Sequence, residues 1–273
     1  MRLVTFRAGD EVQVGELCED RIRVFAAPTM VDWLAGEGRL ETGVEHAPDS
    51  VELLAPIPEP PSVRDFFAFE EHVRAGMRLR GADVPEVWYQ APTFYFSNPA
   101  SIVGPGAEVA KPVETQMLDF ELELAAVIGP DQEIAAFTLL NDWSARDVQA
   151  REMTVGLGPA KGKDFATSLG PWLVTADEVP VADGRVDLEA TASVIGEVLT
   201  RSWAGAQHFS WPDLVAEAAR NTRLRPGDVL GSGTLNRGCL LELGPLAGDR
   251  FLQAGDTVAL EAGPLGRLVN RIA

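Results

Sequence analysis

Three carboxylates alternate along one short stretch of the chain, and their spacing could serve metal chemistry. Asp119, Glu121 and Glu123 occupy every second position at the start of segment 117–129, which continues as an apolar run. Because side chains alternate across a β-strand, the three carboxylates are expected to share one strand face. Buried like charges are costly without a cation, and carboxylate oxygens are preferred ligands of hard divalent cations. The pattern predicts either a metal site or the acidic, solvent-exposed face of an edge strand.

A second pattern joins an aspartate to a histidine. Ser62 and Asp65 have capping-box spacing, and Gly76 could end a helix, so we expect a helix across 62–76. On that helix Asp65 and His72 would lie about 10 Å apart along the axis, a gap that a small substrate could fill. An isolated histidine on a helix is more often structural, so His72 is only a candidate base.

The segment 137–153 reads as a strand that runs into a helix. Asp142, Arg146, Gln149 and Met153 follow helical spacing and are expected to share one face, which could bind a ligand or simply be solvated.

A glycine-rich loop follows at 156–167 and invites comparison with a phosphate-binding loop. Leu157 and Asp164 stand where that motif requires Gly and Ser or Thr, so the sequence excludes it. Lys163 and the loop N–H groups could still face an anion.

The remaining segments supply the scaffold. Residues 1–55 read as short strands with one helix capped by Thr29, and the proline-rich stretch 55–61 reads as a stiff connector. Further strands are expected within 168–175, 186–194 and 197–201, around 224–234 and at 240–244, and a helix is expected to begin at Ser210. We therefore expect a small β-rich N-terminal segment at 1–58 and a catalytic domain at 59–273.

Composition limits the classes of partner. The 273 residues carry a net charge of −18 and are 46% hydrophobic, typical of a soluble globular protein. Nucleic acid and anionic membranes are poor partners for so acidic a chain. Two distant cysteines, without a signal-peptide pattern or an apolar run of transmembrane length, favour the cytoplasm.

Taken together, these motifs resemble the fumarylacetoacetate hydrolase family over roughly residues 60 to 270. The resemblance rests on Asp65 with His72, on 118–123, on Asn141-Asp-Trp-Ser-Ala-Arg-Asp-Val-Gln149, on Gly162-Lys163, on 232–234 and on Leu241-Glu242. It implies an α+β fold, a mixed β-roll with peripheral helices, usually assembled as a homodimer. It also implies a divalent metal, commonly Mg²⁺ and sometimes Ca²⁺ or Mn²⁺. The ligands implied by position are Asp65, Glu121, Glu123 and Asp142. Asp119 falls outside this set, and we interpret it as a supporting or structural carboxylate.

The resemblance further implies hydrolysis of a C–C bond in a β-diketone acid, such as an acylpyruvate or a fumarylacetoacetate-like compound. His72 would be the base that activates water, oriented by Glu242, and Lys163 would hold the carbonyl or the leaving carbanion. Tyr95, Arg146, Gln149 and Thr234 would line the substrate pocket.

Two departures from the family pattern bear on the substrate. Met153 replaces a tyrosine found in fumarylacetoacetate-cleaving members, and Asn98 replaces a lysine found in many bacterial relatives. Both changes remove groups that could address a distal carboxylate, so we expect a less polar or shorter acyl chain.

Other reactions remain open at the same site. Relatives with this arrangement act on 2-oxo or 2-hydroxy-dienoic acids as decarboxylases, isomerases or hydratases. A metal-stapled binding protein without turnover is a further alternative, although such a protein would not need His72 or Lys163.

Overall fold

The computed structural model describes all residues from 1 to 273, and most of its strands belong to two sheets. The strands of the larger sheet are β1 (Arg2–Ala8), β2 (Glu11–Leu17), β3 (Ile22–Phe25), β4 (Glu41–His46), β5 (Glu52–Leu53), β6 (Val63–Phe66), β7 (Phe94–Ser97), β8 (Ile102–Val103), β11 (Leu122–Ile128), β12 (Ile134–Asp142), β14 (Thr167–Thr175) and β19 (Val229–Gly231). Their order is β4-β3-β2-β1-β14-β12-β11-β19-β6-β7, with β5 on β1 and β8 on β14.

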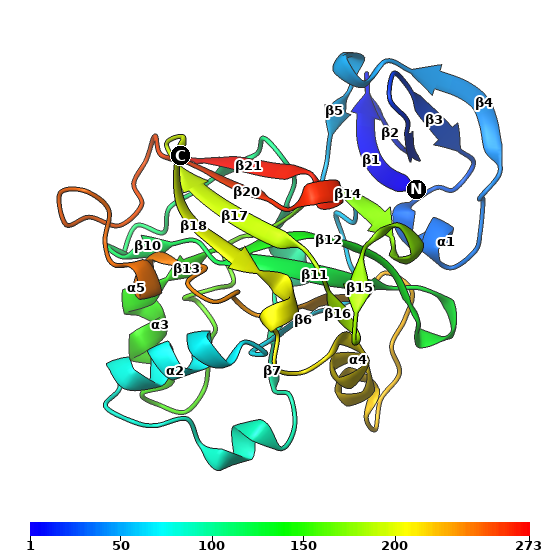
Figure 1. Ribbon diagram of the computed structural model, residues 1–273. Coiled ribbons are helices and arrows are strands. Elements are labelled where there is room, and N and C mark those ends of the chain that lie inside the picture. Colours follow the sequence, from blue (N-terminus) through cyan, green and yellow to red (C-terminus); the bar gives the residue numbers. More distant parts are fainter.

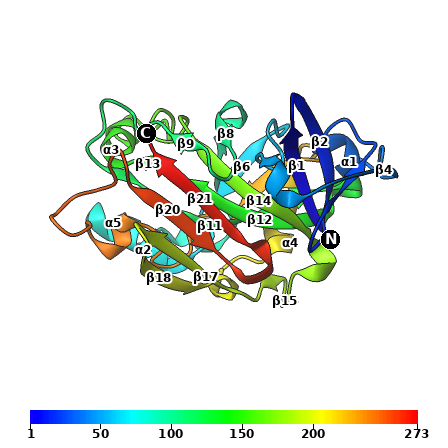
Figure 2. The ribbon, with the colours of Figure 1, turned by 90° about the horizontal axis from the view of Figure 1, so that it is seen from above.

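The smaller sheet lies across the middle of the larger one (Figures 1 and 2). In the order β18-β17-β20-β21-β9, its strands are β18 (Glu197–Trp203), β17 (Glu189–Val194), β20 (Thr257–Glu261), β21 (Arg267–Ile272) and β9 (Glu108–Val109). Two short pairs complete the strands: β10 (Leu118–Asp119) with β13 (Ser144–Ala145), and β15 (Val181–Ala182) with β16 (Arg185–Val186).

The helices are few and lie outside the sheets, so the expected α+β fold with peripheral helices is confirmed. They are α1 (Met30–Leu34), α2 (Glu70–Leu79), α3 (Arg146–Met153), α4 (Trp211–Ala219) and α5 (Leu240–Leu243). Figure 1 shows α2, α3 and α5 grouped at one end, away from α1 and the N-terminal strands. None of the helices has the length and apolar composition needed to cross a membrane.

Strand β11 is central because both of its faces are buried. Leu122, Leu124 and Ile128 point into the main core, which also contains residues of β17, β20 and β21. Ala125 and Val127 point the other way, into a second core shared with the N-terminal strands and α1. A slip of one residue would exchange the two faces, placing Leu side chains where the small Ala125 packs and turning Glu123 to the opposite face.

The N-terminal strands extend the larger sheet. β1 pairs antiparallel with β14, so strands β1–β4 add to the sheet at the edge formed by β14. The division at residue 58 stays a prediction.

Three local predictions are wrong, and tertiary pairing explains two of them. No helix spans 62–76, because Val63–Phe66 forms β6 between β19 and β7, and α2 begins only at Glu70. Asp142 ends β12 and does not lie on the helix with Arg146. The segment 240–244 is helix α5 rather than a strand, since an apolar run this short does not distinguish the two.

The acidic strand also differs from expectation. The expected single strand is interrupted at Phe120 and Glu121, because β10 pairs with β13, whereas β11 pairs with β12 and β19. Asp119 is therefore separated from the face that carries Glu123. By contrast, the caps read from local sequence are confirmed: Thr29 caps α1, and Ser210 forms a capping box with Asp213 on α4.

Candidate metal and active site

Four buried carboxylates meet at one point of the larger sheet. Asp65 lies on β6, Glu123 on β11, Asp142 at the end of β12, and Glu121 directly before β11. Strands β6, β19, β11 and β12 are consecutive neighbours, so the sheet itself brings the carboxylates together. One oxygen of each lies within 4.8 Å of the others. The structure thus brings together all four residues expected to hold a metal.

A glycine makes room for this cluster. Gly231 lies on β19, between the strands that carry Asp65 and Glu123. A Cβ at position 231 would overlap Asp65 Oδ1 and lie 3.2 Å from Glu123 Oε2. Space that a side chain would occupy is therefore left to the carboxylates.

The buried carboxylates repel one another. Burial, followed by the neighbouring carboxylates, raises the pKa of Asp65 and of Glu123 well above ordinary values. Burial also raises the pKa of Asp142. Burial acts in the same direction on Glu121, but the charges of Lys163 and Arg146 outweigh it and lower the pKa of that carboxyl.

Two oxygens of the cluster have no partner. Glu123 Oε2 and Asp142 Oδ1 are buried and accept no hydrogen bond. Buried acceptors without partners are costly, and a cation between them would remove that cost. The donor set consists of carboxylate oxygens alone, which fits Mg²⁺, Ca²⁺ or Mn²⁺ better than Zn²⁺.

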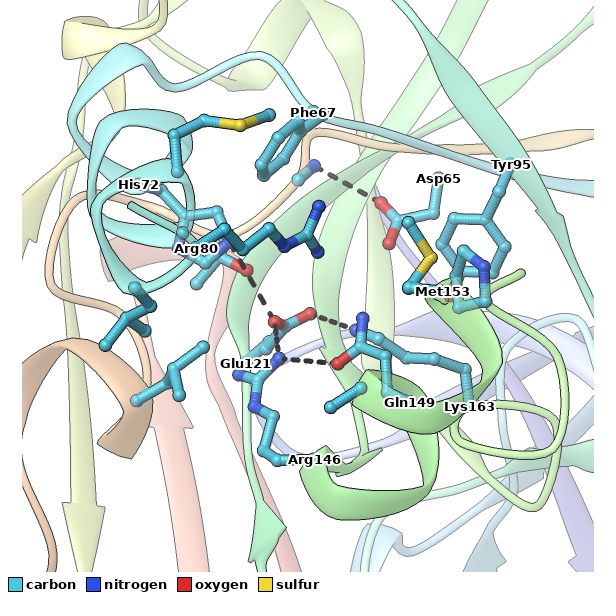
Figure 3. A pocket seen from close by; sticks show the side chains of 18 of the residues that line it. Asp65, Phe67, His72, Arg80, Tyr95, Glu121, Arg146, Gln149, Met153 and Lys163 are labelled. Carbon is cyan, nitrogen blue, oxygen red and sulfur yellow. Dashed lines mark hydrogen bonds and ion pairs between the residues drawn. The ribbon is translucent and has the colours of Figure 1, made fainter. Parts of the chain in front are cut away.

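Protein cations border the cluster on one side (Figure 3). Lys163 Nζ contacts Glu121 and lies 2.5 Å from Asp142 Oδ2, while Arg146 Nη1 lies 2.7 Å from Glu121 Oε1. Arg146 also donates to Gln149 Oε1 at 3.3 Å, and the Tyr95 hydroxyl donates to Asp142 Oδ2 at 2.6 Å. Lys163, Arg146 and Tyr95 therefore contact the carboxylates directly, and Gln149 is connected to them through Arg146.

A histidine–glutamate pair stands beside the carboxylates. His72 on α2 and Glu242 on α5 meet with Nδ1 and Oε2 3.0 Å apart. Glu242 also accepts hydrogen bonds from the backbone N–H groups of Arg237 and Gly238. His72 Nε2 faces the other way and lies 4.0 Å from Glu121 Oε1. The ring is thus held at one nitrogen and presents the other toward the carboxylate cluster.

Except for Asp142 and Glu242, which lie behind the wall, these groups border one cavity of about 870 Å³. Asp65, His72, Glu121, Glu123 and Lys163 form its polar part. Its other predicted lining residues are Tyr95, Arg146, Gln149 and Thr234. Apolar side chains cover the remaining walls: Phe67, Met77, Phe94, Met153 and Leu241. A small polar molecule with a short apolar extension matches this division.

One lining residue was missed by the sequence reasoning. Arg80, at the C-terminal end of α2, extends over the cavity (Figure 3), and its guanidinium makes no hydrogen bond or ion pair within the chain. The other basic side chains that line the cavity each have a carboxylate partner: His72, Arg146 and Lys163. The local sequence provided no signal for this residue, because Gly76 was expected to end the helix, whereas α2 continues to Leu79.

Asn98 does not have the position that the family pattern implied. It lies outside the cavity lining and caps a short 3₁₀ turn, accepting from the N–H of Ala100 and donating to the carbonyl of Asp164. Asn98 itself does not line the cavity, and the effect of the missing lysine on the substrate stays a prediction. Met153 does line the cavity.

Comparison with known proteins identifies the family. The model of the fumarylacetoacetate (FAA) hydrolase C-terminal domain matches residues 62–273. The chain belongs to the fumarylacetoacetate hydrolase family. A second family model, described as Rv2993c-like, N-terminal, matches residues 1–56.

Curated relatives in this family differ in activity. Fumarylacetoacetase of Arabidopsis thaliana is 31% identical over 262 residues, covering 72% of this chain and 61% of the relative. The human mitochondrial oxaloacetate tautomerase FAHD2A is 35% identical over 193 residues, covering 66% of this chain and 59% of the relative. The chain thus spans about three-fifths of the length of these relatives.

A solved structure of the family matches over the whole length. The 5-carboxymethyl-2-hydroxymuconate delta-isomerase of Mycobacterium smegmatis has a TM-score of 0.77 and 26% identity, covering 100% of this chain and 99% of that chain. The family therefore contains hydrolases, isomerases and tautomerases, and membership identifies this chain as related to enzymes without selecting one reaction.

Proposed function

We propose that this protein is a divalent-metal-dependent hydrolase that cleaves a C–C bond in a β-diketone acid, an acylpyruvate or a fumarylacetoacetate-like compound. One observation carries the proposal: three carboxylates of the buried four-carboxylate cluster line the same cavity as His72, whose ring is held by Glu242. The carboxylates would bind a divalent cation, and the His–Glu pair would transfer a proton.

Asp65, Glu121, Glu123 and Asp142 are the residues that would hold the cation. When bound there, a divalent cation supplies Lewis-acid stabilisation of the negative charge that develops on substrate carbonyl oxygens. The four side chains belong mainly to strands of one sheet, and sites built on strands keep their geometry better than sites built on loops.

His72 would act as the general base. Its Nδ1 is engaged by Glu242, which fixes the tautomer and supports the imidazolium that forms when Nε2 takes a proton. A water deprotonated at Nε2 would add to the distal carbonyl carbon. The C–C bond then breaks, its electron pair moves to the α-carbon of the departing enolate, and a proton completes the second product.

The protein cations would hold the negative charge of the substrate. Lys163 and Arg146 border the carboxylates and can donate to the carboxylate and carbonyl oxygens of a 2-oxo acid. Gln149 and Thr234 line the same cavity and offer further polar contacts. Burial, followed by the charge of Asp142, raises the pKa of Tyr95, so this phenol stays a hydrogen-bond donor.

Two kinds of side chain on the cavity wall bear on the choice of substrate. Met153 and Phe67 provide an apolar wall for an acyl chain, while Arg80 offers an unpaired guanidinium to a terminal carboxylate. A panel of acylpyruvates, with and without a terminal carboxylate, tests this division. Turnover of at least one with the formation of two acids supports the hydrolase, whereas no C–C cleavage across the panel contradicts it.

An isomerase or tautomerase is the second candidate, and the relatives with those names favour it. Proton transfer between two carbons or between carbon and oxygen requires His72 but no added water. Turnover in ¹⁸O-labelled water separates the candidates, since hydrolysis places label in a new carboxylate and isomerisation does not. The same assay distinguishes decarboxylation, which releases CO₂ without label in a new carboxylate, and hydration, which places label in a hydroxyl.

A metal-stapled binding protein is the remaining alternative. Two results together would favour it: none of the tested 2-oxo acids is turned over, and the stability gained from metal is the same in His72→Ala as in the wild type. The homodimer expected from the family stays a prediction, which analytical ultracentrifugation tests.

A further inference from the structure

Asp119 is a buried carboxylate outside the four-carboxylate cluster, and it accepts an unusual number of hydrogen bonds. Its side chain is 0% exposed. Oδ1 accepts from the N–H groups of Phe120 and Leu240, each at 2.8 Å. Oδ2 accepts from the N–H of Leu241 at 3.0 Å and from Arg146 Nε at 2.8 Å. Both oxygens are therefore fully engaged.

The partners of Asp119 belong to two different parts of the site. Leu240 and Leu241 begin α5, the short helix that carries Glu242 and so holds His72. Arg146 begins α3 and contacts Glu121, with Nη1 2.7 Å from Oε1. One carboxylate thus connects the helix of the proton-transfer pair to a residue of the metal cluster.

Local structure does not require this connection. Helix α5 has only four residues, and the side chain of its N-cap, Cys239, accepts no hydrogen bond from the backbone N–H groups of the first turn. The N–H groups at the start of a helix have no partners within it, and Asp119 supplies acceptors for two of them. Glu242 follows Leu241 directly, so a shift of α5 would move the carboxylate that holds His72.

We propose that Asp119 is a positioning residue that fixes the His72–Glu242 pair relative to the metal cluster. The proposal rests on the function proposed above. Asp119 touches neither the cavity nor the four-carboxylate cluster. It acts through α5 on the base and through Arg146 on Glu121, and a change at Asp119 should therefore affect metal binding and turnover together.

The variant Asp119→Asn tests this coupling because it keeps the shape and removes the charge. An amide has only one acceptor oxygen. Its NH₂ group would face either Arg146 and the N–H of Leu241, or the N–H of Leu240, so some of these hydrogen bonds would be lost. We expect the Kd for Mg²⁺ to rise and kcat to fall, each by about 10- to 100-fold, as for other groups that orient metal ligands. Calorimetric titration with Mg²⁺ measures the first, and turnover of an accepted 2-oxo acid at saturating Mg²⁺ measures the second.

Asp228→Asn provides a matched control. Asp228 is also buried, accepts from Ser62 Oγ and the N–H of Arg225, and lies 3.6 Å from Arg64. It does not line the cavity. We expect this variant to lose stability while keeping the Mg²⁺ affinity. Mg²⁺ affinity at wild-type level in Asp119→Asn, or a change no larger than that in Asp228→Asn, would overturn the proposal.

A measurement on the wild type covers the case in which Asp119→Asn does not fold. Hydrogen exchange at the amides of Leu240 and Leu241, which donate to Asp119, should slow when Mg²⁺ is added, because a bound cation holds Glu121, Arg146 and Asp119 in place. Exchange that is unchanged by Mg²⁺ at concentrations that saturate binding would contradict the coupling. Affinity and exchange need no substrate, so they separate failure of this proposal from failure of the hydrolase assignment.

Discussion

Replacing Glu242 by Gln should slow the reaction without weakening metal binding. Glu242 Oε2 lies 3.0 Å from His72 Nδ1 and accepts from the N–H of Gly238 at 3.1 Å, and its Oε1 accepts from the N–H of Arg237 at 3.2 Å. A glutamine offers one acceptor oxygen and one NH₂ group. The NH₂ group is a donor, and it would face either His72 Nδ1 or one of the backbone N–H groups, which are donors themselves. The ring would then lose the partner that fixes its tautomer.

The magnitude follows from the lost contact. A hydrogen bond to a charged group is worth about 1.5–3 kcal/mol, and each 1.36 kcal/mol in the activation free energy changes the rate about tenfold. We therefore expect kcat to fall about 10- to 150-fold. The Kd for Mg²⁺ should stay unchanged, since Glu242 lies outside the four-carboxylate cluster.

The assay measures kcat and KM at saturating Mg²⁺ for any acylpyruvate that the wild type cleaves. His72→Gln should reduce kcat at least as much, and the double variant should be no slower than the slower single variant, because the two residues act as one unit. A wild-type kcat in Glu242→Gln, or additive losses in the double variant, would refute the assignment of the pair as the base.

Three further predictions address the metal cluster, the cavity and the scaffold. Gly231→Ala should weaken Mg²⁺ binding at least tenfold in calorimetry, because its Cβ would displace Asp65 and crowd Glu123; an unchanged Kd would contradict this packing. Arg80→Ala should raise KM about 10-fold or more for acylpyruvates with a terminal carboxylate and leave that of apolar ones unchanged, as expected for a lost charge-assisted contact; equal effects on both would exclude the proposed role. Asp213→Asn should lower the melting temperature at pH 7, because the hydrogen bonds from the Ser210 side chain and backbone lower the pKa of Asp213. This stability is present above the unfolded pKa of about 4 and is lost as the pH falls through the lower folded value, so the difference from wild type should shrink in acid. A constant difference would contradict it.

The sequence predicts those features that depend on neighbouring residues. The helices capped by Thr29 and Ser210 were predicted because a cap acts within one turn. Strand alternation indicated a metal site as one of two readings of the carboxylates at 119, 121 and 123, and the family resemblance selected Glu121 and Glu123. The family resemblance then placed Asp65 and Asp142 with them, and the sheet brings all four together.

The features that the sequence did not predict depend on distant partners. Asp65 lies on a strand because β19, more than 160 residues later, pairs with Val63–Phe66, and nothing near Ser62 indicates this pairing. The strand is interrupted at Phe120 because the residues before it pair with β13 and those after it pair with β12. Arg80 reads as an ordinary exposed arginine, and only the surrounding fold shows that it extends over the cavity.

A crystal structure of the Mn²⁺-loaded protein tests the metal site itself. We expect one anomalous peak between Asp65, Glu121, Glu123 and Asp142, within coordinating distance of an oxygen of each, with Glu123 Oε2 and Asp142 Oδ1 among the ligands. A peak elsewhere, or no peak at a concentration that saturates binding, would contradict the metal site on which the proposed chemistry depends.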